Sequence, residues 1–116
     1  MKTIAIYGDS ISTGTHGEGG YEAMLKSSFS LEKVYNFAVG SSGLTRKTPG
    51  GMLEVLDKNP VPEDAELFLI WHGSNDWYWG SGMEEFSHGV KEAVNRLRAA
   101  APTAELVWVT PIYRFE

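Results

Sequence analysis

Three short polar segments each follow an apolar run, and their residue types are those that acyl transfer uses. The segments are residues 8–10, residues 40–43 and residues 73–76. Acyl transfer needs a nucleophile and donors aimed at the developing oxyanion. Ser10 offers a hydroxyl, the backbone N–H groups of Ser10 and Gly40 offer two donors, and the Asn75 amide offers a third. Gly-Asp-Ser is also an ordinary turn sequence, because all three residue types favour turns.

The elements between these segments alternate between strand and helix. Apolar runs predict strands at residues 2–8, 33–39, 65–72 and 105–110, the third continuous enough to be buried on both faces. Helical spacing predicts helices over residues 20–29, 48–59 and 81–101. We therefore expect an α/β fold with three layers, a parallel sheet carrying helices on both faces. The polar segments would then meet at the carboxyl edge of the sheet, where ligands bind.

Two local patterns predict where helices begin. Thr48-Pro49 is typical of an N-cap followed by proline at the first helical position. Ser81 and Glu84 have the spacing of a capping box at the start of the strongest helical pattern in the chain.

Length and composition limit the classes of function. The 116 residues suffice for one domain, residues 1–116, and the formal charge of −5 gives no reason to expect nucleic acid or an anionic membrane as partner. The absence of cysteine excludes disulfides and thiolate chemistry. No leader pattern precedes the first strand, and no apolar run approaches the roughly 20 residues that span a bilayer. These features predict a cytoplasmic protein.

Taken together, the three segments resemble the SGNH hydrolases, also called the GDSL esterase/lipase family. Residues 8–12 match the first block with isoleucine in place of leucine, residues 36–43 match the second, and residues 73–76 match Gly-x-Asn-Asp. The resemblance implies Ser10 as nucleophile and the N–H groups of Ser10, Gly40 and the Asn75 side chain as oxyanion hole. It also implies a flavodoxin-like sheet and hydrolysis of small carboxylic esters, including acetyl or sugar esters, without metal or cofactor.

One block of the family pattern is missing. Asp-x-x-His, which provides the general base and its orienting carboxylate, does not occur in these 116 residues. We therefore expect a fragment truncated after the fourth strand, without the fifth strand and the histidine helix, and with little or no esterase activity. The alternative is a non-catalytic module that binds carboxylates or acetylated ligands in the same hole.

The three histidines have different expected roles. His16 follows Ser10 closely enough to act as a substitute base, but we expect an ordinary solvent-exposed loop histidine. His72 ends the third strand beside the site, so we expect it to be packed and hydrogen-bonded under the loop; the alternative role is to help orient Asn75. His88 points away from the apolar face of its helix and is predicted to lie on the surface.

Several residues are expected to support the site. The two carboxylates of Asp9 and Asp76 could bind a metal ion together or act as an acid/base pair. We expect instead that Asp9 binds N–H groups in its own turn. Asp76 is expected to fix the loop that aims Asn75. Among the adjacent aromatics, Trp77 and Trp79 are candidates for lining the substrate pocket. Arg46 and Lys47 are charges that either meet an anionic substrate or, as we expect, are simply solvated.

The apolar edge of the fourth predicted strand indicates that the chain has a protein partner. If no fifth strand pairs with it, its apolar edge is free to recruit another chain. We therefore expect a homodimer formed through residues 106–113, by strand pairing or by segment swapping.

Overall fold

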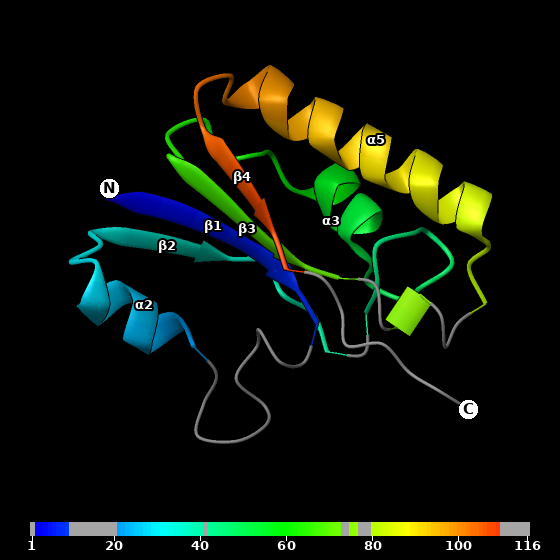
Figure 1. Cartoon of the computed structure of the whole chain (residues 1–116), viewed down its shortest axis with the longest axis horizontal. Coiled ribbons are helices and arrows are strands. Elements are labelled where there is room, and N and C mark those ends of the chain that lie inside the picture. The colour runs from blue at the N-terminus through cyan, green and yellow to red at the C-terminus, as the bar shows by residue number, and fades with distance from the viewer. Residues whose placement is uncertain (1, 10–20, 41, 73–74, 77–79, 110–116) are drawn as a thin grey trace.

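A computed structural model of the chain describes residues 2–9, 21–40, 42–72, 75–76 and 80–109 (Figure 1). Within these ranges strands and helices alternate, which confirms the predicted α/β class. The elements are β1 (Thr3–Gly8), α2 (Glu22–Ser28), β2 (Lys33–Asn36), α3 (Met52–Lys58), β3 (Leu67–Trp71), α5 (Met83–Ala100) and β4 (Glu105–Trp108).

The strands form one parallel sheet in the order β2-β1-β3-β4. This is the flavodoxin-like order that the resemblance implied. Helices α3 and α5 lie on one side of the sheet and α2 lies on the other (Figure 1). The order reverses between β1 and β3, and such a switch point is where open α/β sheets bind ligands, at the carboxyl ends of the strands. Asp9 and Asn75 follow these two central strands.

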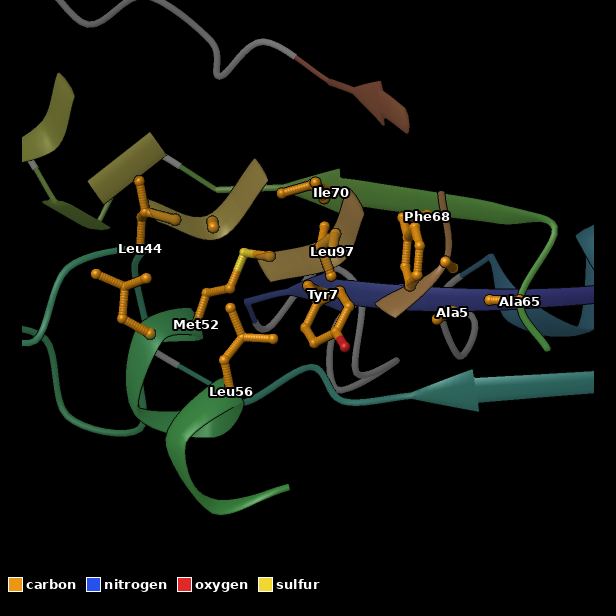
Figure 2. Packing of buried hydrophobic residues seen from close by; sticks show 12 residues of the cluster. Ala5, Tyr7, Leu44, Met52, Leu56, Ala65, Phe68, Ile70 and Leu97 are labelled. Carbon is orange, nitrogen blue, oxygen red and sulfur yellow. The ribbon is translucent and has the colours of Figure 1, made fainter. Parts of the chain in front are cut away.

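The main core lies between the sheet and helices α3 and α5 (Figure 2). Strand side chains alternate between the two faces, so every second residue of β1 and β3 enters this core. Its fully buried larger members are Tyr7, Phe68, Ile70, Met52 and Leu97. Leu44 joins them from the loop after β2. Leu44 therefore anchors that loop in the core.

The opposite face of the sheet is covered more thinly. Its cluster has three buried members, Ile4, Ile6 and Leu31, and α2 contributes no buried residue. In β3 only Phe68 and Ile70 are fully buried, while Leu67, Leu69 and Trp71 are half-buried. The prediction that this strand is buried on both faces is therefore wrong, because α2 reaches only part of the second face.

The predicted start of the second long helical segment is also wrong. Helix α3 begins at Met52 with Gly51 as its N-cap, and no side chain caps it. The Thr48 hydroxyl instead donates to the Thr45 carbonyl oxygen at 2.8 Å. Thr48 thus closes a turn inside the loop after β2, because its hydroxyl finds a backbone acceptor three residues earlier.

The predicted capping box does not form. Helix α5 begins at Met83 after the N-cap Gly82, again without a side-chain cap. The Ser81 hydroxyl lies 2.7 Å from the Thr45 hydroxyl, in a hydrogen bond between segments 36 residues apart. Ser81 therefore connects the start of α5 to the loop after β2, a contact that local spacing does not reveal.

Candidate functional site

The Asn75 amide lies where the three polar segments meet. Its Nδ2 donates to the Ser42 carbonyl oxygen at 2.8 Å and lies 3.4 Å from Oδ2 of Asp9. Asp9 follows β1, Ser42 belongs to the loop after β2, and Asn75 follows β3. Among the described residues, the predicted convergence at the carboxyl edge is thus observed.

Asp76 fastens the loop after β2 to the segment after β3. Its carboxylate is 2% exposed and accepts hydrogen bonds from the backbone N–H groups of Leu44, at 2.7 Å, and Thr45, at 3.0 Å. A Cβ at Gly43 would lie 2.6 Å from Oδ2 of Asp76, so only glycine permits this approach. Asp76 therefore holds the neighbouring loop, whose Ser42 carbonyl in turn orients Asn75.

Ser42 is a site residue that sequence reasoning did not single out. Its buried hydroxyl donates to the Val39 carbonyl oxygen at 2.7 Å and lies 3.3 Å from the carbonyl oxygen of Gly8. Ser42 therefore ties its loop to the last residue of β1 while its own carbonyl binds Asn75. Nothing in the sequence marks this role, because it depends on which backbone groups the fold brings together.

Gly40 differs from Gly43 in the space around its backbone. It is exposed, and a Cβ built on it would meet nothing within 4 Å. Contacts with the described residues therefore do not require glycine here. The side of the backbone where a side chain would stand is open to a ligand.

His72 is buried at the end of β3 and is 2% exposed. Burial lowers its pKa to about 4, because the cationic form would be poorly solvated. The imidazole is therefore neutral at pH 7. The expectation that it is packed is confirmed, and its buried Nδ1 has no hydrogen-bond partner among the residues that the structure describes. The amide nitrogen of Asn75 contacts Ser42 and Asp9 instead.

The two cations of the loop after β2 are engaged in ion pairs. Arg46 binds Asp57 of α3 at 3.0 Å and Glu92 of α5 at 2.7 Å, and Lys47 lies 3.3 Å from Glu85. Arg96 contacts the same Asp57 at 2.8 Å, and the two guanidinium groups lower the pKa of Asp57 to about 2. These charges are exposed, as expected, but they bind carboxylates as well as water. His88 is exposed on α5, which confirms its prediction.

Comparison with known proteins decides the family. Residues 6–116 match the GDSL-like lipase/acylhydrolase family. The chain belongs to this family. The matched range includes all three polar segments, which confirms the resemblance seen in the sequence. Comparison with curated protein sequences gives no match.

Solved structures share the fold of this GDSL-family chain at low sequence identity. A protein from Lactobacillus plantarum has a TM-score of 0.81 and 21% identity, covering 96% of this chain and 56% of its own. A protein of the G-D-S-L family from Desulfitobacterium hafniense has a TM-score of 0.74 and 17% identity, and the match covers 93% of this chain and 58% of that protein. A family two carbohydrate esterase from Clostridium thermocellum, in complex with cellohexaose, has a TM-score of 0.72 and 20% identity, and the match covers 98% of this chain and 44% of the esterase. The chain thus spans about half the length of these structures.

Four candidate residues of the GDSL-family site lie outside the described ranges. They are the nucleophile candidate Ser10, the substitute base His16 and the pocket candidates Trp77 and Trp79. Their roles stay predictions from the sequence and the family pattern.

The described residues give no sign of a metal centre or a membrane span. Searching these ranges finds no group of three or more metal-ligating side chains. Asp9 and Asp76 instead accept or approach N–H groups of the site itself. No helix in the same ranges is long and apolar enough to cross a membrane.

Proposed function

We propose that this protein hydrolyses carboxylic esters at the carboxyl edge of its sheet. Ser10 is the nucleophile, and the N–H groups of Ser10, Gly40 and the Asn75 side chain bind the oxyanion. Membership of the GDSL-like lipase/acylhydrolase family supports this function. The observation that carries it is the anchored amide of Asn75, held by Ser42 at the switch point of the sheet.

The geometry of the Asn75 amide suits an oxyanion donor. One N–H is fixed by the Ser42 carbonyl at 2.8 Å, which sets the orientation of the whole group. The contact with Asp9 at 3.4 Å is long for a hydrogen bond, so this side of the amide gains most from a ligand oxygen. Because Asp76 and Ser42 fix the loop beforehand, the donor needs little reorganisation when charge develops.

Gly40 completes the hole on the side of β2. Its backbone is open where a side chain would stand, so an acyl oxygen can approach its N–H closely. In the proposed reaction, the Ser10 hydroxyl oxygen attacks the ester carbonyl carbon and the carbonyl oxygen becomes the bound oxyanion. The serine proton must pass to a base, and buried neutral His72 is poorly suited to hold it as a cation. We therefore expect weak turnover, because general-base catalysis typically contributes about 10²–10⁴ in rate.

Acetyl esters, including those on sugars, are the substrates we propose. The fold resemblance to a carbohydrate esterase in complex with cellohexaose supports a sugar-bearing alcohol group. Trp77 and Trp79, adjacent to the Asn75 segment, would offer flat apolar surfaces to such a sugar.

Hydrolysis of p-nitrophenyl acetate and of an acetylated xylo-oligosaccharide tests this proposal. Asn75→Ala should lower kcat/KM by about 10²–10³, the usual cost of losing one oxyanion donor. Gly40→Ala should lower it as well, because the methyl group blocks the open side of the backbone. Gly82→Ala is the matched control, because that glycine is also exposed with nothing within 4 Å of a Cβ. Activity that survives Ser10→Ala would contradict the nucleophile assignment.

A binding module is the second candidate, favoured by the neutral, buried His72. In that case the same hole holds the carboxylate or acetyl oxygen of a ligand without cleaving it. Calorimetric titration with acetate and an acetylated sugar separates the candidates. Binding lost in Asn75→Ala, together with no ester hydrolysis by the unsubstituted chain, would favour the module.

A further inference from the structure

A groove lies between β2, at one end of the sheet order, and the loop that follows α3. Its volume is about 570 Å³, and it is lined by Tyr35, Phe37 and residues 59–64. Small-molecule sites typically have volumes of about 300–1,000 Å³. None of the described residues of the candidate ester site lines this groove. It is therefore a second hollow large enough for a small ligand.

The apolar part of the groove is held in a fixed shape. The rings of Tyr35 and Phe37 are nearly parallel, with 5° between their planes and 6.3 Å between their centroids. The Phe37 ring also stacks at 5.2 Å on Tyr7, which belongs to the main core. The loop contributes Pro60 and Pro62, whose side chains fix the backbone φ angle. A ligand would therefore meet aromatic and proline rings that are already in place.

The polar groups of the groove are mainly hydrogen-bond acceptors with negative charge. Glu63 and Asp64 carry carboxylates, and the described lining residues include no lysine or arginine. The donors beside them are already in use. The Asn59 side-chain amide donates to the Val55 carbonyl oxygen at 3.1 Å, and the Tyr35 hydroxyl donates to the Asp64 carboxylate at 3.2 and 3.3 Å. Such a lining favours a ligand that brings donors and a positive charge.

Lys33 shows how this side of the sheet holds a cation. Its Nζ lies 4.8 Å from the centroid of the Tyr35 ring and 3.8 Å from Oδ2 of Asp64. A cation over an aromatic face is attracted by the ring quadrupole. The side chains of Lys33 and Asp64 are 56% and 55% exposed, and exposed ion pairs contribute little. Another cation could therefore replace the Lys33 ammonium group at little cost.

We propose that this groove binds a small organic cation with a flat apolar body. The body lies against Tyr35 and Phe37. The ammonium group lies between the Tyr35 ring and the carboxylates of Glu63 and Asp64, where it replaces Nζ of Lys33. This inference is independent of the proposed ester hydrolysis, because the two sites share no described residue.

An organic cation fits this groove better than an anion or a neutral molecule. An anion would meet two carboxylates without a lysine or arginine in the described lining. A neutral ring could lie against the aromatic side chains, but it would remove water from the carboxylates without supplying an opposite charge. The cation supplies both the charge and the donors.

A titration followed by amide NMR shifts tests the proposal with two matched probes. One probe is 2-phenylethylamine, a cation at pH 7, and the other is 2-phenylethanol, which has the same ring and chain without the charge. The amine should shift the amides of residues 35–37 and of the loop at 59–64 in a saturable way, with a Kd at least fivefold lower than that of the alcohol. Equal Kd values, or saturable shifts confined to other residues, would overturn the proposal.

Lys33→Met gives the sharpest test, because it should strengthen binding. Without the competing ammonium group, the Kd of 2-phenylethylamine should fall about two- to fivefold, the range that an exposed cation–π contact provides. Lys26→Met is the matched control, because it removes the same charge from an exposed position on α2, on the other side of the sheet (Figure 1). An unchanged or higher Kd in Lys33→Met would overturn the proposed replacement.

Variants of Tyr35 separate the ring from its hydroxyl group. Tyr35→Phe keeps the aromatic face and should change the Kd less than twofold, whereas Tyr35→Leu should raise it about two- to fivefold. Should Tyr35→Leu fail to fold, Asp64→Asn at its exposed position decides. Asp64→Asn should raise the Kd of the amine at least threefold and leave that of 2-phenylethanol unchanged. An unchanged Kd of the amine in this variant would overturn the proposal.

Discussion

Two carboxylates bind the loop after β2, one in the protein interior and one at the surface. Asp76 is 2% exposed and accepts the backbone N–H groups of Leu44 and Thr45. Asp57 has a side chain that is 44% exposed and binds Arg46, the next residue of the same loop, as well as Arg96. One carboxylate binds the backbone in the interior, and the other binds flexible side chains in water.

A lowered pKa is a poor guide to what an ion pair contributes to stability. Asp57 accepts hydrogen bonds from Arg46 and Arg96, and these guanidinium groups lower its pKa to about 2. Solvent screens such pairs, and holding long side chains in one geometry costs entropy. The N–H groups bound by Asp76 have no water to replace a lost acceptor. We therefore expect the loop, and with it the orientation of Asn75, to depend on Asp76.

The largest expected effect comes from replacing the two carboxylates by isosteric amides. Asp76→Asn should lower the free energy of unfolding by about 3 kcal/mol, because the amide oxygen can still accept from one buried N–H group while the amide NH2 faces the other, and an unsatisfied buried N–H costs about 1–3 kcal/mol. Asp57→Asn should change it only slightly. Urea unfolding followed by circular dichroism measures both. If both variants lowered the free energy of unfolding equally, the exposure of a carboxylate would not determine what it contributes to stability.

A second contrast between buried and exposed polar groups concerns histidine. Burial lowers the pKa of His72 to about 4 from an ordinary value of 6.5, so the unfolded chain binds a proton more readily than the native one. The stability linked to His72 is therefore complete above pH 6.5 and is lost as the pH falls from 6.5 to about 4. A shift of this size corresponds to about 3 kcal/mol.

His72→Gln should flatten the pH dependence of the unfolding free energy between pH 6.5 and 4. His88→Gln, on the exposed side of α5, is the matched control and should leave the slope unchanged. Urea midpoints at several pH values measure the slope. If His72→Gln kept the slope of the unsubstituted chain, another group would have to titrate in this window.

The sequence predicted the fold well because the fold depends on local periodicity. Apolar runs placed all four strands within a few residues, and the alternation of elements gave the parallel sheet. The errors concern side chains with two available uses. Ser81 and Thr48 could each cap a helix, but their hydroxyls bind Thr45 in the loop after β2. Local spacing does not decide which partner a hydroxyl binds, because the Ser81 hydroxyl finds its partner 36 residues away and the Thr48 hydroxyl finds a backbone acceptor three residues before it.

The sequence predicted which residues would meet at the candidate site, but not the contacts that hold them. The strand ends indicated that Asp9 and Asn75 would converge, and the structure places them 3.4 Å apart. The loop that orients the amide depends on the Ser42 carbonyl and on N–H groups 31 and 32 residues before Asp76. Backbone groups carry no residue-type signal, so such contacts become visible only when the chain is folded.

The smallest expected effect is the response of Asp57 to salt. Its pKa of about 2 results from two guanidinium groups at an exposed position, so mobile ions should screen the attraction. Carboxyl chemical shifts measured by NMR across an acid titration should give this value at low ionic strength. In 0.5 M sodium chloride the pKa of Asp57 should move upward toward the ordinary value for aspartate. A pKa independent of salt would mean that the ion pairs with Arg46 and Arg96 are less accessible to solvent than their exposure indicates, and the contrast with Asp76 would narrow.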